Sequence, residues 1–423
     1  MGAEQRPGAP VRQGVAVAAA LTVVVVALNL RASIAVVPPV LGEVQQAHGL
    51  SLTAAGLLTT LPLLCFGLVA PVAGWLGNRW RLEPVLAGAM LTLALGLVGR
   101  SYAGTPGLFA GSLVVGAAIT VGNVLVPGMV KRDFRTTSSM MTAVYVTTFT
   151  GGAAVAAGVS IPLAGWSDLG WQGALSVWAL PAVVAAALLV VRARRGGRAL
   201  PPSAAPGATT EQLPPVSVWR SPVAWLITGY TGLQSLLFYA GLTWLPTILV
   251  DAGLTRRDAA LALVLYTIVG VPVSLLVPFL ARGTDHRLPL VLPGPFVVVG
   301  LVGLGAWPQQ WLLWTVVMAV ALGWGLSIGL SQVVLRAGSP AVAARLSAMS
   351  QFAGYLLTAC GTWAAGATAE ATDGWTLSLA GLVAVVVAML GCGLLAGRPT
   401  ATVRGRGPAA PSVPMQEPLR PLP

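Results

Sequence analysis

An arginine lies inside the first long apolar run of the sequence. Arg31 stands in the segment 27–33 (ALNLRAS), well within the apolar stretch 14–38. A guanidinium keeps its proton in proteins, and a charge at such a depth in a membrane costs about 2.5–3.5 kcal/mol on insertion scales. All twelve acidic residues lie in loops, tails or the ends of apolar runs. A fork of donors without a protein anion predicts an anionic or strongly electronegative ligand. The alternative is that carbonyls, amides and water satisfy Arg31, which then only braces its helix.

Other polar and aromatic side chains interrupt the apolar runs and could line the same cavity. Asn29 is close to Arg31 in the sequence, and Gln351 and Tyr355 share a helix face at i, i+4. The residues expected to contact a solute are Arg31, Asn29, Asn123, Tyr145, Gln234, Tyr239, Gln351 and Tyr355. For each residue besides Arg31 the alternative is an interhelical hydrogen bond or an anchor at the membrane interface. The same alternative applies to Gln332 and Trp244.

No pattern in the sequence predicts catalysis or a bound metal. A nucleophile–base set, a metal cluster and a phosphate loop are all missing from the sequence pattern. Cys65, Cys360 and Cys392 fall inside apolar runs without metal or redox spacing, which is typical of packing thiols. We therefore expect no enzyme, no cofactor and no metal site.

The composition indicates which elements position these residues. Hydrophobic residues make up 56% of the 423 and charged residues only 9%, with a mean hydropathy of +0.82. Soluble domains carry roughly 25% charged residues, so most of this chain must face lipid or a protein interior. The net charge of +12 is divided among short clusters between apolar runs. Because these clusters form no continuous basic face, nucleic acid is not expected as a partner.

The apolar runs predict an all-α integral membrane protein with twelve transmembrane helices. They cover 14–38, 52–76, 84–103, 106–130, 138–165, 171–193, 221–250, 257–281, 288–306, 310–335, 344–369 and 374–396. The proline-rich stretch 194–219 is expected to be a cytoplasmic linker between a six-helix half at 14–193 and another at 220–396. Residues 1–13 are expected to form a cytoplasmic tail and 397–423 a disordered one.

Repeats and charges support two pseudo-symmetric halves. Prolines and glycines recur at an offset of 207 residues, as in Pro39 and Pro246, Gly116 and Gly323, and Gly122 and Gly329. Of the 24 basic residues, Arg100, Arg256 and Arg257 fall on one side of the membrane and Arg31 lies within a span, which leaves 20 on the other side. Since Lys and Arg collect on the cytoplasmic side, both termini are expected in the cytoplasm.

Several segments resemble one family of transporters. They are Asn29-Leu30-Arg31, 56–62 (GLLTTLP), 122–127 (GNVLVP) with 131–134 (KRDF), 234–239 (QSLLFY) with 244–246 (WLP), and 354–357 (GYLL). Together they resemble the cyanate and 2-nitroimidazole permease branch of the major facilitator superfamily over most of residues 27–370. The family's usual proline after the arginine is Ala32 here. The resemblance implies transport of a small anionic or electron-rich solute, with helices 1, 4, 7 and 10 around a midplane cavity.

The loop 74–81 (GWLGNRWR) resembles the superfamily's signature loop, whose acid–Arg pair latches the inner gate. Asn78 stands where that loop usually has Asp, next to Arg79, and the second-half copy at 282–287 keeps an acid, Asp285. The resemblance therefore implies gating roles for Asn78, Arg79 and Asp285, with a weakened or differently partnered latch in the first half.

These observations predict a multi-pass permease of the plasma membrane, working by alternating access with Arg31 as electrostatic anchor. Its partners would be a small solute and the lipid bilayer, and we expect a monomer. One alternative is efflux of an antibiotic or other amphiphile, which the absence of an intramembrane acid in the sequence disfavours. A distant alternative is a receptor that transports nothing.

Overall fold

The computed structural model describes residues 9–134, 136–166, 170–195, 218–280, 285–399 and Val403. These residues form α-helices, two short 3-10 turns and an isolated bridge between Ala337 and Val403. Most of the expected linker 194–219 and of the expected tails 1–13 and 397–423 lies outside the described residues.

The helices fall into two sets along the chain. The first set is α1 (Ala9–Ala35), α2 (Val37–His48), α3 (Leu52–Leu68), α4 (Ala70–Arg79), α5 (Leu82–Tyr102), α6 (Gly104–Asp133), α7 (Ser138–Trp166), α8 (Gly170–Ser176) and α9 (Ala179–Arg195). The second set is α10 (Pro222–Asp251), α11 (Arg256–Ile268), α12 (Gly270–Leu280), α13 (Arg287–Val291), α14 (Pro293–Ala306), α15 (Trp311–Leu335), α16 (Pro340–Ala371) and α17 (Thr376–Ala396).

Prolines explain why some crossings consist of two helices. Proline has no N–H and disrupts a helix interior, but it fits the first turn of a helix. It occupies that first turn in α2, α4 and α14, each of which follows its predecessor after a short break. The bend between α3 and α4 is 48°. Each such pair is one interrupted crossing.

The described helices account for twelve crossings. Ten segments are long and apolar enough to span a membrane, and the bent pair α3–α4 makes eleven. The more polar α16, with 32 residues, is the twelfth. The predicted all-α membrane fold of twelve helices is therefore confirmed.

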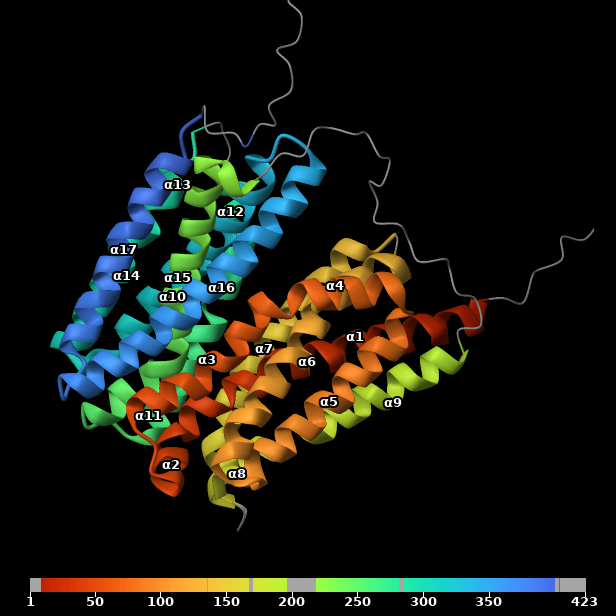
Figure 1. The fold of residues 1–423 in the computed structure, drawn as a ribbon, viewed down its shortest axis with the longest axis horizontal. Helices are drawn as coiled ribbons and strands as arrows, with labels where there is room; N and C mark the ends of the chain where they lie inside the picture. Colours follow the sequence, from red (N-terminus) through yellow and green to blue (C-terminus); the bar gives the residue numbers. More distant parts are fainter. Residues whose placement is uncertain are drawn as a thin grey trace, which may run out of the picture.

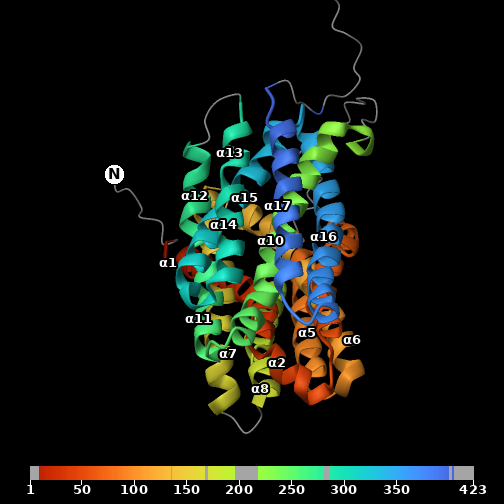
Figure 2. The ribbon, with the colours of Figure 1, turned by 90° about the vertical axis from the view of Figure 1, so that its left-hand side faces the viewer.

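The two sets of helices form two bundles that meet at one end (Figure 1). We call the basic face the end where α4, α6 and α9 end and α10, α13 and α16 begin, and the far face the opposite end. Figure 2 shows the helices of the second bundle running side by side between these faces. In Figure 1 the two bundles diverge toward the basic face.

Two polar contacts between the bundles lie at the far face. Arg256 of α11 forms an ion pair with Glu43 of α2, at 2.7 Å. The backbone N–H of Thr53, in the first turn of α3, donates to the Glu370 carboxylate at the end of α16, at 2.6 Å. Both contacts join the first bundle to the second, so they hold the far face closed.

Candidate functional site

Arg31 lies where the two bundles meet, in a cluster of aromatic rings. Its Nη1 donates a hydrogen bond to the Tyr239 hydroxyl of α10, at 3.1 Å. The guanidinium carbon lies 5.1 Å from the ring centroids of Phe149 and Phe238 and 5.2 Å from that of Tyr239. These distances are within the range of cation–π attraction. Phe149 belongs to the first bundle, whereas Phe238 and Tyr239 belong to the second.

A close helix contact brings Phe149 to Arg31. Gly152 of α7 packs so tightly on α1 that a Cβ atom there would lie 2.8 Å from the Leu28 carbonyl oxygen. Phe149 is about one turn before Gly152, and Arg31 is about one turn after Leu28. The glycine therefore allows α7 to place an aromatic ring over the guanidinium.

Tyr266 of α11 fixes the position of Phe238. The Tyr266 hydroxyl lies 3.1 Å from the Leu237 carbonyl oxygen and 3.2 Å from that of Phe238, and donates to them. Its ring stacks on Phe238 with centroids 5.6 Å apart. Tyr266 is buried, so it acts as a rigid support behind Phe238.

A second layer of rings surrounds the first. The Tyr355 ring lies 6.3 Å from Tyr239 and 5.2 Å from Phe66, and the Tyr145 ring lies 5.8 Å from Phe149. Tyr145 and Tyr355 are both within electrostatic reach of Arg31. The structure therefore gathers four of the eight expected residues, Arg31, Tyr145, Tyr239 and Tyr355, into one cluster.

The guanidinium of Arg31 keeps donors that no acceptor among the described residues uses. Within the described part of the chain, Tyr239 is its one hydrogen-bond partner and no carboxylate forms an ion pair with it. Aromatic faces pack against the guanidinium but cannot accept its in-plane N–H bonds as a carboxylate does. Such a planar fork matches anions and other planar groups with two acceptors.

The two expected asparagines make few polar contacts. Asn29 is fully buried, and its Nδ2 donates to the Val25 carbonyl at 2.7 Å. The Oδ1 atoms of Asn29 and of Asn123 are buried without a partner among the described residues. Their roles in solute binding stay predictions.

The two expected glutamines bond elsewhere. The buried Gln234 donates from Nε2 to the Leu322 carbonyl of α15, at 3.0 Å, which is the interhelical bond weighed as its alternative. The exposed Gln351 donates to the Ser347 hydroxyl at 3.3 Å. A contact of either glutamine with a solute stays a prediction.

Phe149 and Phe238 are functional candidates that the list of expected residues omits. Phe149 is four residues after Tyr145 and Phe238 is four residues after Gln234, so helical periodicity could have pointed to both. Arg100 also differs from expectation. The sequence count places it on one side of the membrane as a topology signal, but it is only 2% exposed and lies inside the bundle.

The loops with expected gating roles make few contacts in this structure. Asn78 and Arg79 are exposed and have no polar partner in the described ranges. Asp285 accepts from the backbone N–H of Arg287 at 3.0 Å. Gating by these residues stays a prediction.

The ion pairs of the first bundle's basic face involve other residues. Arg132 pairs with Glu83 at 2.5 Å and with Asp133 at 2.7 Å, and Arg192 pairs with Asp133. These pairs tie together the basic ends of α5, α6 and α9.

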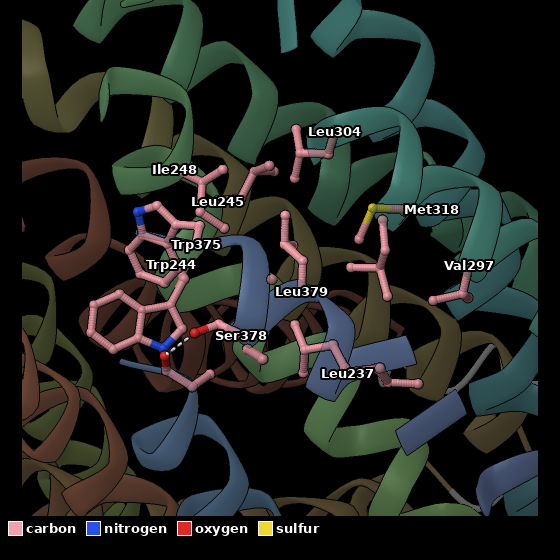
Figure 3. A pocket seen from close by; sticks show the side chains of 15 residues that line it. Leu237, Trp244, Leu245, Ile248, Val297, Leu304, Met318, Trp375, Ser378 and Leu379 are labelled. Carbon is pink, nitrogen blue, oxygen red and sulfur yellow. Dashed lines mark hydrogen bonds between the residues drawn. The ribbon is translucent and has the colours of Figure 1, made fainter. Parts of the chain in front are cut away.

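An apolar cavity lies away from Arg31, within the second bundle. Its empty space, counted out to its open mouth, is about 450 Å³ between α10, α14, α15, α16 and α17, and its lining is almost wholly apolar. Figure 3 shows Trp244, Trp375 and Met318 around it, with the Ser378 hydroxyl bonded to the Ala365 carbonyl at 2.7 Å. This cavity has no charged group to hold a polar solute.

Comparisons with known proteins agree on one family. A model of the Major Facilitator Superfamily matches residues 19–362. The chain is 34% identical over 377 residues to the 2-nitroimidazole transporter of Escherichia coli (strain K12), covering 89% of this chain and 94% of that protein. It is 29% identical over 348 residues to the cyanate transport protein CynX of the same organism, covering 82% and 88%.

A solved structure has the same fold. A bacterial homologue of the human lysosomal transporter Spinster, in an inward-facing and unoccupied conformation, superposes with a TM-score of 0.75. It is 16% identical and covers 95% of this chain and 100% of that one. At this level of identity the similarity concerns the fold alone.

Proposed function

The chain belongs to the major facilitator superfamily, and we propose that it is a permease that moves a small anionic or electron-rich polar solute by alternating access. Family membership confirms the resemblance expected from the sequence and makes the protein a multi-pass membrane transporter rather than an enzyme. The solute class and the role of Arg31 as its electrostatic anchor are the proposal. The observation that carries it is a half-buried guanidinium whose one described hydrogen-bond partner is a tyrosine hydroxyl.

The position of Arg31 supports coupling between binding and movement. Arg31 and Phe149 belong to the first bundle, whereas Phe238 and Tyr239 belong to the second. A solute bound to the guanidinium would contact both bundles, so its binding energy would depend on how they are arranged. A ligand shifts a conformational equilibrium only through such differential contacts.

The chemistry of the cluster supports a small planar solute. A nitro group or a carboxylate-like anion can accept two N–H bonds from the guanidinium edge, and the rings around it can stack on a heterocycle. The relatives are named for 2-nitroimidazole, whose nitro group and ring fit this description, and for cyanate, a small linear anion that can accept from the guanidinium through a terminal atom. We therefore propose cyanate-like anions and nitro-heterocycles as the solute class.

The charge distribution supports an orientation. Twenty of the 24 basic residues fall on one side by the sequence count, and that side is the basic face. We propose that this face and both termini are cytoplasmic, with the protein a monomer in the plasma membrane. The two bundles, 14–193 and 220–396, would be the units that rock around Arg31.

Transport by purified protein in proteoliposomes tests the proposal. Labelled cyanate and 2-nitroimidazole should each show counterflow, and a cationic amphiphilic dye should not. Arg31→Gln should abolish counterflow, whereas Arg257→Gln, which removes an exposed arginine at the far face, should keep it. Transport of the dye without either labelled solute would instead favour efflux of amphiphiles.

A further inference from the structure

A second arginine, beyond Arg31 toward the far face, is buried without a hydrogen-bond partner in the described part of the chain. Arg100 belongs to the last turn of α5 and is 2% exposed. Its Nε and Nη2 atoms are buried and have no hydrogen-bond partner among the described residues. The ion pairs found in the described ranges do not include Arg100 either. A buried charged donor is costly to the protein unless an acceptor completes it.

Arg100 lines a cavity between the two bundles. The empty space of this cavity, counted out to its open mouth, is about 360 Å³, and its polar lining residues are Arg100, Thr59, Ser112, Tyr239 and Thr243. The Thr59 hydroxyl donates to carbonyls of its own helix, and so does that of Ser112. These two hydroxyls are thus engaged as donors, and the lining contains no acidic side chain to neutralise the guanidinium.

The cavity lies one helical turn beyond Arg31 toward the far face. Its wall includes Ile34, about one turn after Arg31 on α1, and Thr243, about one turn after Tyr239 on α10. One turn is about 5 Å along a helix. Tyr239 belongs to both places, because its hydroxyl accepts the bond from Arg31 and its side chain lines the Arg100 cavity.

We propose that Arg100 forms a second anion subsite, through which a small monovalent anion passes between the far face and Arg31. Arg31 donates to the Tyr239 hydroxyl and Arg100 lines the same cavity as Tyr239, so an anion that leaves one guanidinium would next meet the other. The contacts of Glu43 and Glu370 join the two bundles at the far face in the present state. The inference rests on the proposed function, because both arginines would serve one solute path.

The test observes the Arg100 guanidinium directly. Full-length protein labelled with ¹⁵N-arginine is placed in detergent micelles in chloride-free gluconate buffer, and potassium cyanate is titrated in. Buried Nε–H groups exchange slowly with water, so the Nε–H signal of Arg100 should be observable by NMR. It is assigned by its disappearance in Arg100→Gln or, where that variant does not fold, in Arg100→Lys. We expect a saturable shift of the Arg100 signal both in the parent protein and in Arg31→Gln.

Thermal unfolding gives a second readout with the same probe. Cyanate-induced stabilisation should fall in part in Arg31→Gln and in part in Arg100→Gln, and should vanish in the double variant. Arg100→Lys, which keeps a charge, should retain a portion of what Arg100→Gln loses. Loss of the entire effect in Arg31→Gln alone would contradict a second subsite.

The outcomes separate this inference from the proposed function. An Arg100 signal that stays fixed while the Arg31 signal shifts overturns the subsite and leaves the proposed function standing. If neither the Arg100 signal nor the Arg31 signal shifts, both the second subsite and the proposed function are overturned for cyanate. If the Arg100 signal shifts with chloride but not with cyanate, the site binds a chloride ion that stays in place. That result would also overturn the proposal that the solute passes Arg100.

Discussion

Replacement of Arg31 by glutamine separates solute binding from bracing of α1. Arg31 donates one charge-assisted hydrogen bond and lies against three aromatic rings. The bond contributes about 1.5–3 kcal/mol and each ring about 0.5–1 kcal/mol. Removing an intramembrane charge recovers about 2.5–3.5 kcal/mol. Because these contributions partly offset, the free energy of unfolding of the ligand-free variant should fall by about 1.5 kcal/mol, and by no more than about 3.5 kcal/mol.

The effect on ligand binding should be much larger. A planar anion on the guanidinium edge would form two charge-assisted bonds, each contributing about 1.5–3 kcal/mol. Their loss corresponds to roughly a hundredfold or greater rise in Kd, since about 1.4 kcal/mol changes an affinity tenfold. Stabilisation by ligand depends on the ratio of its concentration to Kd, so the share of the thermal shift that comes from binding at Arg31 should disappear together with transport.

The assay measures both quantities on the same purified variants. Ligand-free Tm and the affinity for cyanate and 2-nitroimidazole are compared in the parent, Arg31→Gln, Arg31→Lys and the control Arg257→Gln. Arg31→Lys keeps a charge but loses the planar fork, so it should bind weakly and lose most against two-acceptor ligands. Tyr239→Phe removes one hydroxyl but keeps the ring near the guanidinium, so it should weaken binding far less than Arg31→Gln.

A structural brace would give the opposite pattern. Arg31→Gln would then lower Tm without ligand by many degrees, and the surviving protein would still bind. An Arg31→Gln protein that binds solute as tightly as the parent would refute the role of Arg31 as anchor.

Further predictions concern the gates and the orientation. Asn78→Asp should restore the acid of the signature loop and increase the population of the state that is open at the far face. The increase should be several-fold at most, because exposed ion pairs contribute about 0–1 kcal/mol. If the accessibility of cysteines at the two faces does not change, this loop is not a latch. The Glu370 carboxyl lies at the exposed end of α16, beyond the expected span 344–369, and hydrogen bonds from Thr53 lower its pKa. The contact between Glu370 and Thr53 is therefore complete above the ordinary pKa of 4.5 and is lost as the pH falls through the lowered pKa. Glu370→Gln should therefore open the far face to a cysteine reagent at neutral pH, and the parent should do so only in acid. In a background without native cysteines, Gln309→Cys should react with an impermeant thiol reagent in intact cells and Arg79→Cys should not; the reverse result would invert the orientation.

The central charge of the site could be predicted from the sequence because residue type and position suffice. Arg31 stands in an apolar run, and all twelve acidic residues lie outside the middles of such runs. The neighbours of Arg31 could be predicted only in part. Tyr145, Tyr239 and Tyr355 were chosen as aromatic residues in spans expected to line a cavity, but their meeting depends on helix contacts such as that of Gly152 with α1.

Arg100 shows why depth along a helix is hard to read from one sequence. It lies two residues from the end of α5, where a charge would normally reach the interface and count as a topology signal. The structure instead packs α6 across it, with a Cβ at Gly111 falling 2.6 Å from the Arg100 Cβ. The burial comes from the pairing of α5 with α6, which no local pattern encodes. The break after Ala35 and the continuation of α2 to His48 likewise extend the first crossing beyond its expected end at 38.

The distribution of polar contacts favours movement between rigid halves over movement within them. On the basic face, Arg132 ties α6 to α5 within the first bundle. In the second bundle, Arg336 donates to the Gln332 side chain at 3.1 Å and to the Gly397 carbonyl at 2.9 Å, which ties α15 to the end of α17. These bonds stay inside one bundle, whereas the far-face contacts of Glu43 and Glu370 join the two. A rocking motion would break only the far-face pair of contacts and would preserve the internal ties. Arg31 and its aromatic cluster lie between the far-face contacts and the ties at the basic face. The bundles can therefore turn about the place where we propose that the solute is held.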